Sequence, residues 1–169
     1  MSYSFDIATV RSAKVRALWD YWSALRQDQA MPRRASIDPT AIGALLPNII
    51  ISEISRDPFR VRYRLVGTAC VQYAHLDFTG MYLDELDFGP TDSEPWQHYY
   101  TLICEHRKPL FGSTAIPAGD EGQVGIEFGM FPLAGDGETV SQCISLEDYE
   151  LVKRYQLDLL ERATRKDRA

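Results

Sequence analysis

The sequence predicts an α+β domain built on a five-stranded antiparallel sheet, with helices inserted between the second and third strands. Residues 59–66 alternate between large apolar side chains and arginines, which indicates a strand with one buried face. Gly67 ends this alternation, and segments of helical spacing follow up to residue 107. Two further alternating stretches, residues 124–130 and 140–146, flank an Ala-Gly-Asp-Gly loop typical of a hairpin.

Length and composition are those of one globular domain with helical extensions. The chain has 169 residues, of which 45% are hydrophobic and 25% charged. We divide it into a lead-in and amphipathic helix at residues 1–30, a central domain at 31–147 and a C-terminal helix at 148–169. The net charge of -6 argues against a general phosphate-binding surface, so we expect no nucleic-acid partner.

Compartment is inferred from hydrophobic runs and cysteines. No apolar run reaches the roughly 18 residues that span a bilayer, and the first 14 residues lack the apolar core of a signal peptide. The three cysteines are far apart and odd in number, as expected for buried free thiols in a reducing compartment. We therefore expect a cytoplasmic protein without a membrane partner.

The first element after a loose lead-in at residues 1–10 is an amphipathic helix at about residues 10–29. Its apolar positions recur with helical spacing and must either cover the domain or pair with another chain. We expect a homodimer, with an interface through Val15, Leu18, Trp19, Trp22 and Leu25.

The middle of the chain predicts a hairpin and a helical layer. A short helical turn entered at Asp38 precedes a strand at residues 48–54, which a turn at 56–58 joins to the strand at 59–66. Short helical segments follow, and then a longer helix at about 96–107 whose aromatic face should lie on the sheet. Strands at 110–116, 124–132 and 140–146 complete the domain.

Four segments carry a resemblance to a known family: MPRRASIDP, LLPNIIISEI, FRVRYRLVGT and DFTGMYLDEL, between residues 31 and 86. Together with the order of elements, they resemble the PAS fold and, at motif level, an alphaproteobacterial family of small PAS-like proteins. The resemblance runs from about residue 18 to 146. It departs mildly at Phe78, where the family has leucine in an Asp-Leu-Thr-Gly-like turn. The resemblance implies a sensor-type or adaptor domain and no catalytic residue.

The candidate ligand site is the space between the sheet and the helix at 96–107. Ligand sites are mostly apolar with a few polar anchors, which tyrosine hydroxyls and an amide could supply. The candidates are Tyr63, Leu65, Cys70, Tyr73, Trp96, Tyr99, Tyr100, Ile103, Phe128, Met130 and Gln142. The same residues could instead form an ordinary core, since aromatic side chains dominate such cores.

Cofactor and enzyme signatures are weak. Haem needs an axial ligand facing the pocket, and His75, His98 and His106 are poorly placed on the predicted elements. A photoactive flavin site needs a cysteine among amides, but the chain has a single asparagine. No phosphate loop, hydrolase or zinc-protease motif occurs, so we expect no enzyme and assign neither a cofactor nor a metal.

The role of one group of charged residues stays open. Arg33, Arg34 and Asp38 could form a local salt bridge and cap, or they could join the arginines of the strand at 59–66 in an anion or partner site. Two functions therefore remain: a small sensory or signalling domain that binds a small molecule or a protein, and a dimeric adaptor that binds no ligand.

Overall fold

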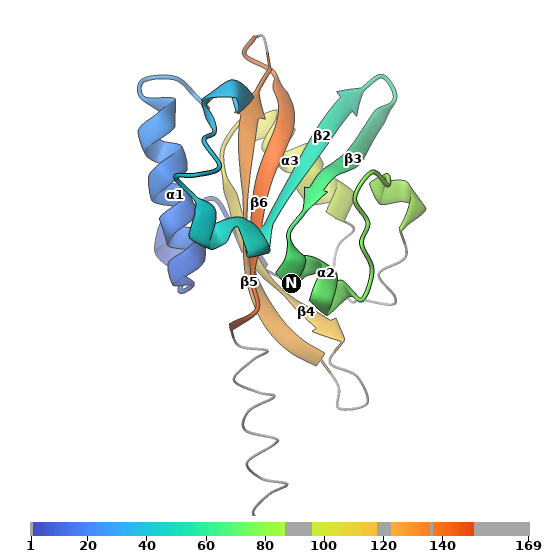
Figure 1. The fold of residues 1–169 in the computed structure, drawn as a ribbon. Coiled ribbons are helices and arrows are strands. Elements are labelled where there is room, and N and C mark those ends of the chain that lie inside the picture. Colours follow the sequence, from blue (N-terminus) through green and yellow to red (C-terminus); the bar gives the residue numbers. More distant parts are fainter. Residues whose placement is uncertain (1, 87–95, 118–122, 136, 151–169) are drawn as a thin grey trace, which may run out of the picture.

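A computed structural model describes residues 2–86, 96–117, 123–135 and 137–150. Its centre is a six-stranded antiparallel sheet in the order β1-β4-β5-β6-β2-β3 (Figure 1). The strands are β1 (Ser2–Ser4), β2 (Ile49–Arg56), β3 (Phe59–Val66), β4 (Leu110–Pro117), β5 (Gln123–Ala134) and β6 (Val140–Asp148). The helices are α1 (Ala13–Arg26), α2 (Thr68–Ala74) and α3 (Trp96–His106), with 3-10 turns η1 (Ile7–Thr9), η2 (Arg34–Ser36), η3 (Gly43–Asn48) and η4 (Leu83–Glu85).

The predicted α+β class and the insertion of helices between the second and third main strands are confirmed. The β2–β3 hairpin precedes α2, η4 and α3, and β4, β5 and β6 follow as a meander. β6 then pairs with β2, which places the first hairpin beside the last strand.

The first ten residues differ from the prediction of a loose lead-in. Ser2–Ser4 form β1, which pairs antiparallel with Phe111–Ser113 of β4 and adds a sixth strand to the sheet. A short segment can pair with the edge of an existing sheet without an alternating sequence pattern of its own. Three residues are also too few to show the periodicity of a strand. At Asp38 the chain makes a hydrogen-bonded turn, in which the Ala41 N–H donates to the Asp38 carbonyl at 3.2 Å and Asp38 Oδ1 accepts the Thr40 N–H at 2.9 Å. The 3-10 turn η3 follows from Gly43.

Helix α1 covers one face of the sheet, and α2, η4 and α3 lie on the other side (Figure 1). Ser12 caps α1 by accepting the Val15 N–H at 3.1 Å. The apolar stripe of α1, which consists of Val15, Leu18 and Trp22, packs on β5 and β6. The Trp22 ring centroid is 6.2 Å from that of Phe131 on β5. On the opposite face, Trp96 and Tyr99 of α3 pack against Phe128.

Strand β3 contains a register shift that the alternating sequence conceals. Ile51 pairs with Leu65, but the next residue of β2, Ser52, pairs with Tyr63, so Arg64 is an extra residue on β3. One extra residue reverses the face of the side chains beyond it. Tyr63 is buried against the helical layer, whereas Leu65 remains 39% exposed.

The outer edge of β3 is covered by the chain itself. The Tyr63 N–H donates to the Met81 carbonyl at 3.0 Å, and the Gly80 N–H donates to the Tyr63 carbonyl at 2.7 Å. Gly80 has a φ of 88°, a conformation that glycine adopts without strain. The Asp77–Gly80 turn thus returns the chain to the sheet and protects an otherwise open edge.

The helix predicted at residues 148–169 lies almost wholly outside the described residues, and β6 extends to Asp148. Among the described helices, none combines the length and the hydropathy that crossing a bilayer requires.

Candidate functional site

The layer between the sheet and the helices α2 and α3 is the candidate site. Its floor is formed by one face of β2, β3, β5 and β6, and its roof by the inner faces of α2 and α3. The part beneath α3 is tightly filled, because Tyr99, Ile103, Phe128 and Met130 are each at most 1% exposed. The part beneath α2 is a second cluster that includes Tyr63, Cys70, Phe78 and Tyr149.

A group of hydroxyls joins these two parts. Ser52 Oγ lies 2.6 Å from Tyr100 Oη, a hydrogen bond between a strand of the floor and a helix of the roof. Tyr63 lies within hydrogen-bonding reach of Tyr100, and burial raises the pKa of both phenols. Both tyrosines are therefore neutral and can each donate or accept a hydrogen bond. Both belong to the tyrosines whose hydroxyls we proposed from the sequence as polar anchors for a ligand.

A second polar group lies where β6 ends. The Tyr149 hydroxyl donates a hydrogen bond to the Glu147 carboxylate, and the Tyr149 ring stacks on that of Tyr73 with centroids 4.3 Å apart. Burial raises the pKa of Glu147, and the Tyr149 hydrogen bond partly offsets the effect. Asn48 donates its amide to the Glu147 carbonyl oxygen at 2.7 Å, which fixes the end of η3 to the same strand.

The sequence interpretation missed Glu147 and Tyr149 because it ended the last strand at residue 146. The signal was present, since the alternation of Cys143 and Ser145 continues through Glu147 and Tyr149 on the same face. The helix-like residues after position 150 obscured this continuation.

Comparison with known proteins decides the family. A family model described as PAS domain matches residues 10–146. This chain belongs to the PAS domain family. Among solved structures, it is similar to one titled "Structure of an RNA-binding Light-Oxygen-Voltage Receptor", with 12% sequence identity and a TM-score of 0.48. That match covers 81% of this chain but only 41% of the receptor chain. No curated protein matches this sequence.

Nine of the eleven predicted ligand residues lie in the helical layer of this PAS domain. They are Tyr63, Cys70, Tyr73, Trp96, Tyr99, Tyr100, Ile103, Phe128 and Met130. The other two do not. Leu65 lies beyond the β3 register shift, and Gln142 pairs with Leu133 on the α1 face, where its Oε1 is buried without a hydrogen-bond partner.

The cysteines of the PAS domain are not poised as nucleophiles. Burial raises the pKa of the Cys143 thiol to about 12 and also raises that of Cys70 well above its usual range. The pKa of Cys104, which is half-buried on α3, is raised for the same reason. Since the thiolate is the reactive form, all three are structural thiols at neutral pH.

The histidines lie outside the layer. His98 is 6.3 Å from the Tyr3 ring at the β1 edge, His106 is 4.8 Å from the Phe5 ring, and His75 ends α2 in a left-handed conformation; all three are exposed. Within the described ranges, no group of three or more His, Cys, Asp or Glu side chains could hold a metal ion.

The arginines of β3 bind neighbouring groups of the chain. Arg60 donates to Asp84 Oδ1 at 2.8 Å and lies 3.7 Å over the Tyr82 ring, while Arg64 Nε is 3.3 Å from Glu53 Oε1. The backbone of Arg33 forms an isolated β-bridge with Ala134 on β5. The strands β6 and β2 lie between β5 and β3, so Arg33 is not beside the β3 arginines. The structure therefore contradicts one joint anion site and favours local pairing of the β3 arginines.

The predicted dimer stripe of α1 is occupied within the chain. Val15 and Leu18 are 0% exposed and Trp22 is 2% exposed, all packed on the sheet. A contact between two chains through these three side chains is contradicted, because the sheet of the same chain already covers them. Trp19 and Leu25 are only partly buried at the border of that core.

Proposed function

We propose that this PAS domain is a small sensory or signalling protein without catalytic activity, acting in the cytoplasm. It transmits a signal by binding a small molecule in the layer beneath α2 and α3, by contacting a protein partner, or by both. The observation that carries the proposal is the cluster of three buried hydroxyls, those of Ser52, Tyr63 and Tyr100.

Buried hydroxyls are costly unless they are paired, by about 1–3 kcal/mol for each unpaired group. Ser52 is 0% exposed and Tyr100 3% exposed, so their hydroxyls rely on hydrogen bonds among Ser52, Tyr63 and Tyr100. A ligand that enters the layer must replace one of these bonds with its own donor or acceptor. Such a ligand is largely apolar and carries one or two neutral polar groups, since neither a lysine nor an arginine belongs to this group.

Native mass spectrometry of the purified chain tests ligand binding. We expect a small molecule to be retained by the wild type and lost or weakened in Tyr100→Phe. The matched control is Tyr21→Phe, because the Tyr21 hydroxyl bonds Asp38 on α1's side of the sheet, away from the layer. An unliganded mass, together with no thermal shift across a metabolite panel, would overturn the sensory proposal.

The dense packing beneath α3 favours a second candidate, a ligand-free adaptor that acts through its surface. In that case the four side chains at most 1% exposed there are simply core. We retain a homodimer as part of this candidate, formed through the exposed face of α1 that includes Ala17 and Ala24. Sedimentation velocity of Ala17→Glu with Ala24→Glu tests it, and a species that sediments like the wild type rules out this face.

A further inference from the structure

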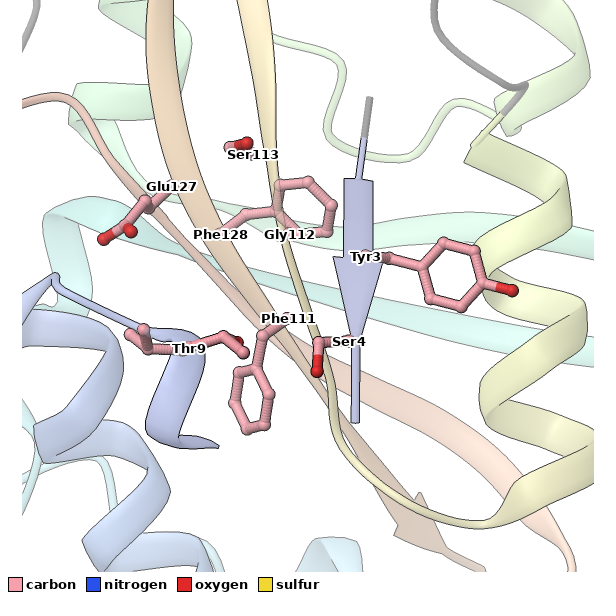
Figure 2. Close-up of a pocket in the computed structure, with 9 residues that line it drawn as sticks. Tyr3, Ser4, Thr9, Phe111, Gly112, Ser113, Glu127 and Phe128 are labelled. Atoms are coloured by element: carbon pink, nitrogen blue, oxygen red, sulfur yellow. The ribbon is translucent and has the colours of Figure 1, made fainter. Parts of the chain in front are cut away.

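A hollow on the α1 side of the sheet is separate from the layer described above. It lies between the turn that leads into α1 and the strands β1, β4 and β5, with a volume of about 220 Å³ (Figure 2). This is below the roughly 300–1,000 Å³ typical of sites for drug-sized ligands. The hollow therefore suits a fragment-sized molecule and is too small for a nucleotide or a haem.

The lining of the hollow combines a buried apolar base with a polar rim. Val10 and Phe111 contribute the apolar part and are 5% and 1% exposed. Ser113 and Glu127 lie at the rim and are direct cross-strand partners, so their side chains emerge side by side from the same face. Figure 2 shows Glu127 and Thr9 on the same side of the hollow, with Phe111 between the strands and the turn.

Glu127 supplies the chemistry of this rim. Its Oε2 accepts the Ser12 N–H at 2.5 Å, and the Arg11 N–H is shared between Oε1 and Oε2 at 3.2 Å each. A carboxylate offers about four acceptor positions, so Oε1 keeps capacity for another donor. Glu127 has no ion-pair partner in the part of the chain that the structure describes.

Two nearby cations, Lys14 and Arg16, pair with other groups of the chain. Lys14 Nζ lies 3.2 Å from Asp148 Oδ1, and the Arg16 guanidinium donates to the Val10 carbonyl. A carboxylate that is fixed by backbone donors, unpaired by a side-chain cation and set at the mouth of an apolar hollow is suited to a charge-assisted hydrogen bond from a ligand.

We propose that this hollow binds a small organic amine, with its ammonium group on Glu127 and its apolar body on Val10 and Phe111. The Ser113 hydroxyl accepts a second hydrogen bond from the ammonium. Because Glu127 also holds the backbone of Arg11 and Ser12, the bound amine is linked directly to the start of α1. The site does not depend on the sensory layer, so its failure would leave that proposal unchanged.

The test is an NMR titration of the ¹⁵N-labelled full chain with phenethylamine. We expect the amide resonances of Arg11, Ser12 and Ser113 to shift together, with half-saturation at about 10 mM, the affinity expected for a ligand of nine non-hydrogen atoms with modest ligand efficiency. The neutral analogue 2-phenylethanol should bind about tenfold more weakly, since it lacks the charge.

Two variants separate the site from the fold. Glu127→Gln keeps an oxygen for the Arg11 and Ser12 amides but removes the charge, so it should reduce affinity for the amine about tenfold. Ser113→Leu fills the rim from an exposed position and should block binding with an unchanged circular dichroism spectrum. Equal binding of amine and alcohol, or unshifted amides at about 10 mM amine, would overturn the proposal.

Discussion

The Trp22 indole N–H donates a hydrogen bond to the Pro132 carbonyl oxygen at 2.9 Å, which fastens α1 to β5. Pro132 has no backbone N–H to donate to a neighbouring strand, so only its carbonyl can form a hydrogen bond. Trp22 is 2% exposed. The contact joins an element near the start of the chain to one near its end. It explains why the N-terminal helix is part of this PAS domain's core and not a free arm.

Trp22→Phe should lower the free energy of unfolding by about 1–3 kcal/mol, because it leaves the Pro132 carbonyl unpaired and removes buried volume. Urea unfolding followed by circular dichroism measures this change. The control is Trp19→Phe, a half-buried neighbour on α1 whose ring stacks on Trp22. Equal losses in the two variants would show that the hydrogen bond adds nothing to the packing.

The pair Ser52 and Tyr100 should behave as a coupled unit. Tyr100→Phe and Ser52→Ala should each cost about 1–2 kcal/mol of stability, because each removes the buried hydrogen bond between these two hydroxyls. The double variant should cost less than the sum, since both polar groups are then gone. Additive costs in chemical denaturation would contradict a direct bond between them.

Glu147 should make the folded protein less stable as the pH rises, whereas a carboxylate in a salt bridge makes a protein more stable as the pH rises. Its pKa in the folded protein is raised above the ordinary 4.5 by burial, so the unfolded chain ionises first as the pH rises. The wild type should therefore lose stability relative to Glu147→Gln from about pH 4.5 upwards, until the pH exceeds the raised pKa. Unfolding curves of both proteins between these limits measure the difference, and parallel pH profiles would contradict burial of the charge.

Tyr149→Phe extends this test. The Tyr149 hydroxyl lowers the pKa of Glu147, so its removal should raise that pKa further and steepen the loss of stability with pH. An NMR titration of the Glu147 side chain reads the pKa directly. A lower pKa in the variant would show that the carboxylate has another donor.

Gly67 is expected to tolerate no side chain. A Cβ there would lie 2.4 Å from the Pro47 carbonyl oxygen and 2.5 Å from that of Leu46, both backbone atoms that can move only with η3. Gly67→Ala should therefore cost about 1–3 kcal/mol or more in thermal or urea unfolding. Gly43→Ala is the matched control, since no atom lies within 4 Å of its Cβ position, and it should be neutral or slightly stabilising.

The sequence by itself determined the elements whose signal is local. The alternation of residues 59–66, the break at Gly67 and the aromatic spacing of α3 each depend on neighbours a few positions away, and each is found where it was predicted. The same local patterns placed nine ligand candidates on the face that the helices cover. Periodicity predicts which side chains share a face of a strand or helix, and this is enough to identify the face that is buried.

The tertiary structure decided what depends on pairing between distant segments. The extra residue at Arg64 turned Leu65 to the other face, and pairing with β4 made a strand of Ser2–Ser4. Whether the α1 stripe met its own sheet or another chain was open in the sequence, because both partners satisfy an apolar face equally well. Likewise, the bond between Ser52 and Tyr100 joins residues 48 positions apart, and only the folded chain brings their hydroxyls within 2.6 Å.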